Sequence, residues 1–234
     1  MKYYQAEMHC HTMEVSPCSR IPAAYLVREY VAAGYRYVFI TDHYHPAVFE
    51  AWRMSGEPWE KCVDYFLSGF EAARKAAEGR EIEILLGMEI CLGIDPETKL
   101  GSDFLVYGFD REFLIAHPYL YRLSFREFYE LMHENGFLVF QAHPYRYHLK
   151  PIEPICYDGI EIVNTHPRHK SHNQRAIRFA MEHGLYVIGG SDAHADEDIG
   201  RGGVMLPEGI CTPMDLVEFY RRNGSPELIV TFGA

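Results

Sequence analysis

Two pairs of side chains in this sequence have the spacing of metal ligands. His9 and His11 enclose one residue, and Asp192 and His194 enclose another. Each pair follows an apolar segment that predicts a β-strand. Side chains two residues apart in an extended segment point to the same side, so each pair can chelate one ion. Imidazole and carboxylate groups together are the ligands of zinc, manganese and iron sites.

Histidine is also unusually frequent. The chain has 13 histidines in 234 residues, more than twice the number expected at a usage of roughly 2%. A single histidine is more often an ordinary surface or core residue than a ligand. Here, however, further polar residues follow other predicted strands: Asp42 with His43, Glu89, Asp110, His143, and Asn164 with His166. The joint pattern favours one shared site.

The elements that would position these residues alternate between strand and helix. Apolar runs predict strands at 2–8, 37–40, 82–86, 104–107, 137–141, 159–163, 186–188 and 228–231, and helices at 22–33, 59–78, 125–134, 171–183 and 213–222. Short apolar strands separated by helices predict parallel βα units, and no linker or repeat divides residues 1–234, so we expect one α/β domain. In an α/β barrel the C-terminal ends of the strands converge on one face, where we expect the polar clusters to meet.

The overall composition limits the classes of function. There are 22 Lys and Arg residues against 33 Asp and Glu, a net charge of −11, and 48% hydrophobic residues. These values are typical of a soluble globular protein and exclude disorder, collagen and a disulfide miniprotein. The acidic balance disfavours duplex nucleic acid as a partner but permits one phosphorylated small molecule in a local cationic pocket.

The sequence has no feature of a membrane or secreted protein. No stretch approaches the roughly 20 apolar residues that span a bilayer, and the first residues lack the apolar run of a signal peptide. The six cysteines are scattered and form no CxxC pair, which favours reduced thiols. We therefore expect a cytoplasmic protein with no membrane partner. The sequence leaves its oligomeric state open.

Six segments, in order, resemble the motifs of the PHP (polymerase and histidinol phosphatase) family. They are His9–Thr12, Ile40–His43, Gly87–Glu89, Ala142–Pro144, Glu161–Asn164 and Gly190–His194. The resemblance spans about residues 5 to 205. It implies a distorted (β/α)7 TIM-like barrel whose trinuclear metal site hydrolyses phosphate esters.

The resemblance also implies a ligand set. His9, His11, Glu89 and Asp192 would surround one ion, Glu89 and His143 would hold a second, and His43 and His194 would hold a third. The sequence departs from the family pattern at two positions. Glu14 is the only metal-competent side chain just after the first motif, and Asp110 stands in for a histidine that often follows the Glu motif. We therefore expect two or three divalent ions, Zn, Mn or Fe.

Clustered divalent ions suit the hydrolysis of phosphate esters. They lower the pKa of a bridging water, so that hydroxide can attack phosphorus, and they neutralise charge on the phosphoryl oxygens. Candidate phosphate-binding residues in loops on this face are Arg20, Arg146, Arg168 and Arg201, and candidate proton donors are His45, His166 and His169. The catalytic candidates are five residues: Asp192, His194, Arg20, Arg201 and His166.

The sequence favours a metal-dependent phosphoesterase that acts on a small phosphorylated metabolite, either a histidinol-phosphate-like monoester or a nucleotide. Two alternatives remain. A related metal-dependent enzyme would hydrolyse C–N or C–O bonds, although no lysine directly follows a predicted strand, where a carbamylated bridging ligand would form. A non-catalytic or regulatory PHP module is the other, and the nearly complete ligand set counts against it.

Overall fold

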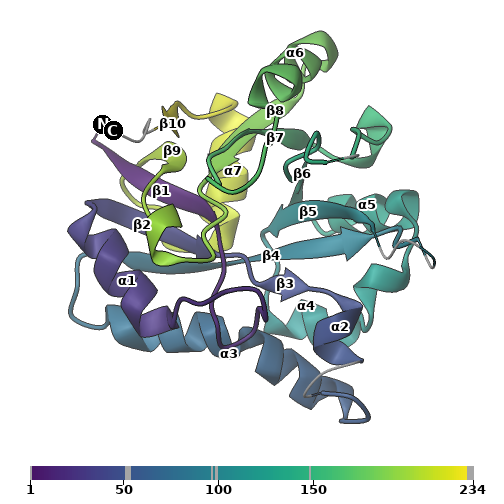
Figure 1. Cartoon of the computed structure of the whole chain (residues 1–234), viewed down its shortest axis with the longest axis horizontal. Helices are drawn as coiled ribbons and strands as arrows, with labels where there is room; N and C mark the ends of the chain where they lie inside the picture. The colour runs from purple at the N-terminus through teal and green to yellow at the C-terminus, as the bar shows by residue number, and fades with distance from the viewer. Residues whose placement is uncertain (1, 51–53, 96, 98–99, 148, 231–234) are drawn as a thin grey trace.

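The sheet that carries the ligands curls into a nearly closed barrel with helices on its outer side (Figure 1). The computed structural model describes residues 2–50, 54–95, 97, 100–147 and 149–230. The strands are β1 (Tyr3–Cys10), β2 (Tyr35–Ile40), β3 (His43–Tyr44), β4 (Glu83–Leu92), β5 (Ser102–Tyr107), β6 (Leu138–Gln141), β7 (Gly159–Asn164), β8 (Tyr186–Gly190), β9 (Gly202–Pro207) and β10 (Leu228–Val230). Their order is β10-β9-β1-β2-β4-β5-β6-β7-β8, and β3 pairs with β4.

The two halves of the sheet approach each other just beyond the ends of β1 and β8. Cys10 and Ala193 form an isolated parallel bridge. The Ala193 carbonyl accepts from the His11 amide at 3.1 Å, and the Ala193 amide donates to the His9 carbonyl at 3.3 Å. This seam brings the two ligand pairs from opposite ends of the sequence side by side.

Strand direction differs from the prediction at two places. The sequence predicted parallel units throughout, but β5 is antiparallel to both β4 and β6, and β9 is antiparallel to β1 and β10. A parallel connection needs a crossover of a dozen or more residues, usually a helix. The chain between Leu92 and Ser102 is too short for that crossover, so β4 and β5 form a hairpin.

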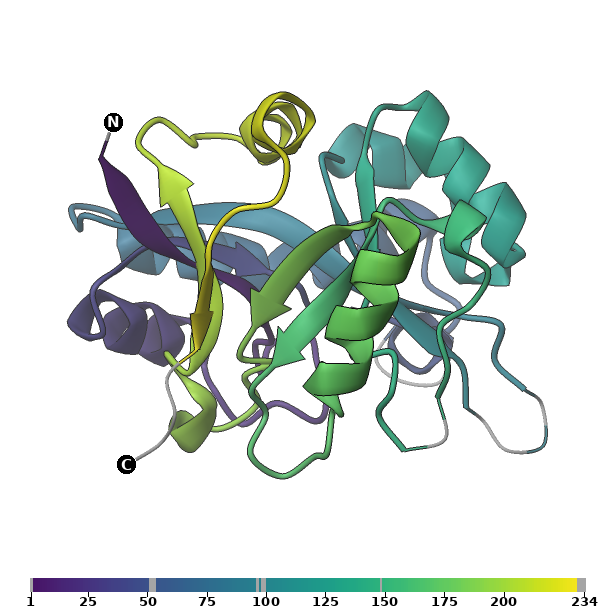
Figure 2. The same cartoon turned by 90° about the horizontal axis from the view of Figure 1, so that it is seen from above.

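The helices are α1 (Ala23–Ala32), α2 (Pro46–Phe49), α3 (Trp59–Ala77), α4 (Arg111–Ala116), α5 (Phe125–Glu134), α6 (Asn173–His183) and α7 (Pro213–Asn223). The five helices predicted from the sequence are confirmed within two residues at each end. Short α2 and α4, and strands β3 and β9, were not predicted. Figure 2 shows α6 along the outer face of β7 and β8, where Ala176 and Ala180 pack against Ile160.

Apolar side chains fill the region beneath the ligand ends of the strands. Met8, Phe39, Leu105, Phe140 and Ile188, from five different strands, are fully buried in one cluster that α7 also joins. Such a packed core fixes the strand ends from which the ligands project. Among the described residues, no helix has the length and apolar character needed to cross a bilayer.

Candidate metal centre

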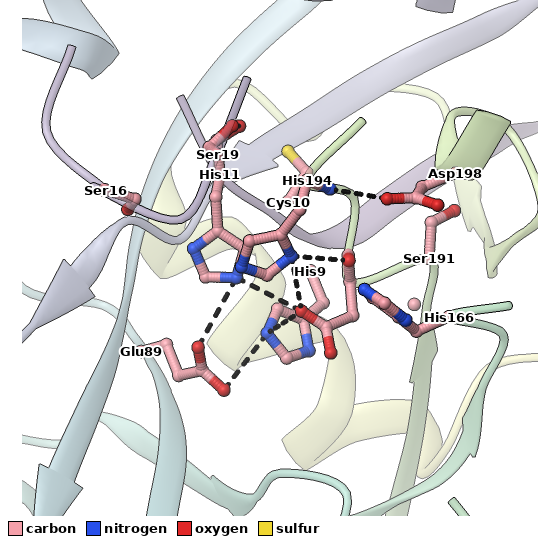
Figure 3. A network of polar contacts seen from close by, with 12 residues as sticks. His9, Cys10, His11, Ser16, Ser19, Glu89, His166, Ser191, His194 and Asp198 are labelled. Carbon is pink, nitrogen blue, oxygen red and sulfur yellow. Dashed lines mark hydrogen bonds and ion pairs between the residues drawn. The ribbon is translucent and has the colours of Figure 1, made fainter. Parts of the chain in front are cut away.

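Two histidines from β1 and its end face two carboxylates, one from β4 and one from the turn after β8. Figure 3 shows His9 and His11 beside the β4 carboxylate, Glu89. His9 Nε2 lies 3.2 Å from Glu89 Oε1 and 3.5 Å from Asp192 Oδ1. His11 Nε2 lies 3.4 Å from Glu89 Oε2 and 3.4 Å from Asp192 Oδ1. All four side chains are almost fully buried.

Three further histidines surround this core. Glu89 Oε2 lies 3.0 Å from His43 Nδ1, and Glu89 Oε1 lies 3.0 Å from His143 Nε2. His194 Nδ1 lies 3.3 Å from Asp192 Oδ1. Among the described residues, potential donor atoms within 4.8 Å of one another form three overlapping triads: His9–Glu89–His143, His9–His11–Asp192 and His11–His43–His194.

Several of these donor atoms are buried without a hydrogen-bond partner. They are His9 Nε2, both ring nitrogens of His11, Glu89 Oε2, His143 Nδ1 and Asp192 Oδ1. Leaving a buried polar atom unpaired costs about 1–3 kcal/mol, so folded proteins rarely collect so many in one place. The residues therefore fit divalent ions, and imidazole with carboxylate suits zinc, manganese or iron.

The ligand groups strongly perturb one another's protonation. Burial acts to lower the pKa of His9, but the Asp192, Glu89 and Glu161 carboxylates raise it well above its usual value. For His11, burial and the neighbouring His194 and His43 lower the pKa well below its usual value. Against the effect of burial, nearby imidazoles hold the pKa values of Glu89 and Asp192 well below the usual range. Both carboxylates are therefore ionised and available to cations.

Glu161 on β7 orients two of the histidines. Its Oε1 lies 3.0 Å from His9 Nδ1, and its Oε2 accepts from the His143 amide at 2.8 Å. A carboxylate on the far ring nitrogen fixes the orientation of a metal-binding histidine and makes it a better ligand. Sequence reasoning gave Glu161 no role, although it lies within one of the recognised motifs.

Asp42 positions a loop instead of joining the cluster. Its carboxylate accepts from the Thr12 amide, the Thr12 hydroxyl and the Ser16 hydroxyl, each at 2.7 Å. The Ser16 hydroxyl in turn accepts from the His43 amide at 3.0 Å. This network fixes the chain that follows His11 against the residue that precedes His43.

Two of the predicted ligands have strained backbones. His143 has φ 25° and Asp192 has φ 52°, a region that costs non-glycine residues free energy. Strain of this kind persists where the surrounding structure holds it, and it is concentrated at functional sites. Here it accompanies the turns that direct both side chains toward Glu89 and His9.

The structure does not bring Glu14 or Asp110 into the described ligand triads. Both Glu14 oxygens accept from the Ala23 amide, at 3.0 and 3.1 Å, at the start of α1. Asp110 caps α4, accepting from the Phe113 amide at 2.8 Å. The reversed direction of β5 explains the second case, because Asp110 follows the end of β5 that points away from the ligands.

Asp103 lies at the other end of β5, beside the cluster. Its Oδ2 is 3.9 Å from His143 Nε2, and its side chain is 24% exposed. Burial and the Glu89 carboxylate raise its pKa. Sequence reasoning missed Asp103 because it assumed that ligands follow strands. In an antiparallel strand the residue at the start occupies that face instead.

The four arginine candidates have different surroundings. Arg146 is buried and pairs with Asp192 and with Asn164, whose Oδ1 accepts at 2.9 Å. Arg168 donates to Asp198 and Glu197. Arg20 lines the cavity above the ligands. Arg201 Nη1 donates to the Glu197 carbonyl at 3.1 Å.

The three candidate proton-donating histidines also lie near the ligands. The rings of His166 and His169 stack with their centroids 4.3 Å apart. The Nε2 atom of His166 lies 3.1 Å from Arg168 Nη2. Burial, together with His169 and Arg146, lowers the pKa of His166 to about 4, so this ring is neutral at pH 7. His45 caps α2 by accepting from the Ala47 amide at 3.0 Å.

Two adjoining cavities open onto the ligands. The smaller, of about 340 Å³, is bordered by Glu89, His143, Asp192 and His194, and by Arg20, Arg146 and Arg168. The larger, of about 790 Å³, is bordered by apolar residues that include Val48, Leu100 and Leu149. Cys18, His43, Asp103, His143 and Arg146 border both cavities.

Cys10 and Gly190 have packing roles at the seam. The Cys10 thiol is buried and donates to the Phe39 carbonyl at 3.4 Å, away from the ligands on either side of it. A Cβ atom on Gly190 would meet His9 Cβ at 2.5 Å. The hydroxyl of Ser191 accepts from the Arg201 and Gly202 amides, so this segment packs tightly and is not a nucleophile elbow.

Comparisons with known proteins identify the fold. A family model described as PHP-associated matches residues 170–224. A two-domain protein from Bacteroides vulgatus containing a predicted PHP-like metal-dependent phosphoesterase superimposes with a TM-score of 0.57 and 17% identity, over 97% of this chain and 57% of that one. The chain has a PHP-type fold. The family resemblance seen in the sequence is thereby confirmed for the fold, as a barrel-like α/β structure.

Two other solved structures resemble this chain over nearly the whole length of both proteins. PsfC from Pseudomonas syringae has a TM-score of 0.65 and 16% identity, over 100% of this chain and 93% of that one. An amidohydrolase from Chromobacterium violaceum, with bound sulfate and no metal, has a TM-score of 0.55 and 16% identity, over 97% of this chain and 98% of that one. A comparison with curated protein sequences gave no match.

Proposed function

We propose that this chain is a metal-dependent phosphoesterase acting on a small phosphorylated metabolite. The observation that carries the proposal is the set of three overlapping donor triads at the base of a cavity bordered by arginines. The neighbour whose name includes a PHP-like metal-dependent phosphoesterase supports the same reaction class.

His9, His11, Glu89 and Asp192 would hold one ion, Glu89 and His143 a second, and His43 and His194 a third. Divalent ions at such a site supply an activated water and offset charge on the phosphoryl oxygens. Glu89 reaches four of the five histidines, so it joins the three positions into one centre.

The protein's own cations would bind the phosphoryl group above these ligands. Arg20 and Arg168 border the small cavity, and guanidinium groups match the geometry of phosphate oxygens. The neutral ring of His166 accepts a hydrogen bond from Arg168, so we assign His166 the role of positioning Arg168 rather than donating a proton. Arg146 already pairs with Asp192 and stabilises that ligand.

The two cavities divide the substrate between them. The small cationic cavity fits the phosphoryl group, and the larger one fits the remainder of the molecule against Val48, Leu100 and Leu149. A monoester with an aromatic or largely apolar alcohol, such as a histidinol-phosphate-like compound or a nucleoside monophosphate, matches this division.

The test is hydrolysis of a panel of phosphomonoesters and diesters by the metal-loaded protein. We expect activity that EDTA removes and that Zn or Mn restores, with aromatic esters turned over faster than glycerol phosphate. A fully loaded preparation that is inert toward the whole panel would reject the proposal.

One observation favours a second candidate, hydrolysis of an amide or a related C–N bond. A structural neighbour of the same fold is named an amidohydrolase. A parallel panel of N-acyl and N-formyl compounds separates the two candidates. Bound metal without turnover of either panel would instead favour a regulatory PHP module.

A further inference from the structure

Cys18 lies on the loop that follows the first ligand pair, and that loop is fastened to the ligands themselves. The Ser19 hydroxyl donates to the His11 carbonyl at 2.9 Å, and the Arg20 amide donates to the His194 carbonyl at 2.8 Å. Cys18 therefore has anchored neighbours on its C-terminal side, and it borders both cavities together with His43.

The three imidazoles nearest to this loop form an incomplete donor set. His11 stacks on His43 and lies against His194, with ring centroids 4.3 Å apart in both cases. Both ring nitrogens of His11 are buried and unpaired. Imidazoles supply no negative charge to an ion, and a tetrahedral zinc site takes a fourth ligand.

Cys18 is the side chain in position to complete this set. The Cys18 thiol is within hydrogen-bonding reach of His194 and His43, and all three residues border the smaller cavity. The thiol thus interacts with two of the three imidazoles. Glu14, the metal-competent side chain that the sequence offered just after the first motif, instead accepts from the Ala23 amide at the start of α1.

We propose that Cys18 is a thiolate ligand of the ion held by His43 and His194. On binding, the S–H bond breaks, a metal–sulfur bond forms and one proton passes to solvent. A thiolate among imidazoles favours zinc, or cobalt as its spectroscopic substitute, over magnesium or manganese. The inference rests on the metal centre of the proposed function but does not require that phosphate esters be the substrate.

The experiment is spectroscopic titration of the metal-free full chain with Co(II). We expect a thiolate-to-cobalt charge-transfer band in the near ultraviolet. The band should be lost in Cys18→Ser and in Cys18→Asp, and retained in Cys211→Ser, which removes another exposed thiol. X-ray absorption of the zinc-loaded protein should show a sulfur neighbour at about 2.3 Å.

A second measurement needs no variant and so does not depend on folding of the mutants. Alkylation of the native chain, mapped by mass spectrometry, should slow at least tenfold at Cys18 when zinc is added, with no change at Cys211. Cobalt bound without the band, or an equal band in Cys18→Ser, would overturn the inference and leave the phosphoesterase proposal standing. Failure to bind any cobalt or zinc would overturn both.

Discussion

Glu89 is the most connected side chain of the centre. It lies within 3.4 Å of ring nitrogens from His9, His11, His43 and His143, and it is 1% exposed. Because this carboxylate contacts members of all three donor triads, its loss should affect more than one of the proposed ions.

Glu89→Gln tests this connection. The amide keeps the shape of the side chain but removes its charge, and we expect at least one ion per chain to be lost. The affinity for the remaining metal should fall by more than the roughly 10–100-fold typical of removing an outer-shell partner. Metal content by mass spectrometry measures the effect. Glu83→Gln, on the same strand but 44% exposed, is the control and should bind metal normally.

Glu161→Gln tests orientation rather than ligation. The variant loses the negative charge facing His9 Nδ1, so we expect metal affinity to fall by about 10–100-fold while the fold is retained. Competition with a chelator of known affinity provides the measurement, and Glu153→Gln, at an exposed position, provides the control. Unchanged affinity would show that Glu161 does not tune the site.

The ligand residues on strand ends could be predicted from the sequence, and the structure brings five of the predicted histidines together with Glu89 and Asp192. The positions of Glu14, Asp110 and Asp103 relative to the cluster could not be predicted. Spacing in sequence states which residues follow a strand, but not the direction in which that strand runs or the path of the loop after it. Because β5 runs antiparallel to its neighbours, Asp103 at its start lies beside the ligands, and Asp110 after its end lies away from them.

Among the elements, the close approach of β8 to β1 sets the position of the first ligand. Gly190 has no room for a side chain, because a Cβ atom would lie 2.5 Å from His9 Cβ and 3.0 Å from the His9 amide nitrogen. At neighbouring Gly189 the nearest atoms would be 3.2 Å away. A substitution at Gly189 is therefore the control for the same substitution at Gly190.

Gly190→Ala should destabilise the fold by about 1–3 kcal/mol, the usual cost of overpacking, and should weaken metal binding because His9 must move. Gly189→Ala should have the smaller effect on both. Urea unfolding and metal titration measure the two consequences. Equal effects at the two positions would contradict the close approach seen at Gly190.

Long elements were predictable and short ones were not. Helix α3 repeats buried residues such as Val63, Phe66 and Ala73 at helical spacing over five turns, so its pattern is unambiguous. Helix α4 has six residues, too few for a clear period, and depends on the Asp110 cap. The antiparallel strands β5 and β9 depend on pairing with distant strands, which local patterns do not report.

At the scale of the whole molecule, Glu7 joins three parts of the fold. Its carboxylate accepts from the His9 amide, the Ser191 amide and the Tyr30 hydroxyl at 2.8–2.9 Å. Burial raises its pKa from 4.5 to about 6 despite these hydrogen bonds. The folded chain thus binds a proton more tightly here than the unfolded chain does.

The stabilising contribution of this proton is complete below about pH 4.5 and is lost as the pH rises through 6. In EDTA-treated protein, raising the pH from 4 to 7 should therefore cost the native chain about 2 kcal/mol of unfolding free energy relative to Glu7→Gln. Urea unfolding at several pH values measures the difference. Glu83→Gln should show the pH dependence of the native chain.

Metal binding should stabilise the whole barrel, because the ligands come from both sides of its seam. At a free metal concentration 100 times the dissociation constant, one ion adds about 2.7 kcal/mol. We expect zinc to raise the melting temperature and EDTA to lower it, as measured by calorimetry. In Glu89→Gln, zinc should raise the melting temperature by less than in the native chain. An equal rise would contradict the proposal that Glu89 joins the metal positions into one centre.

The β4–β5 hairpin also places a candidate ligand and the wall of the larger cavity in separate segments of the chain. Glu89 and its cross-strand partner Leu105 lie within the paired region, while Gly93 and Leu100, in the connection, border the larger cavity. Changing the length or sequence of that connection should alter the wall of the larger cavity without altering the strand register that positions Glu89. Grafting a different connection should therefore change which esters the proposed enzyme accepts while leaving its candidate metal ligands in place.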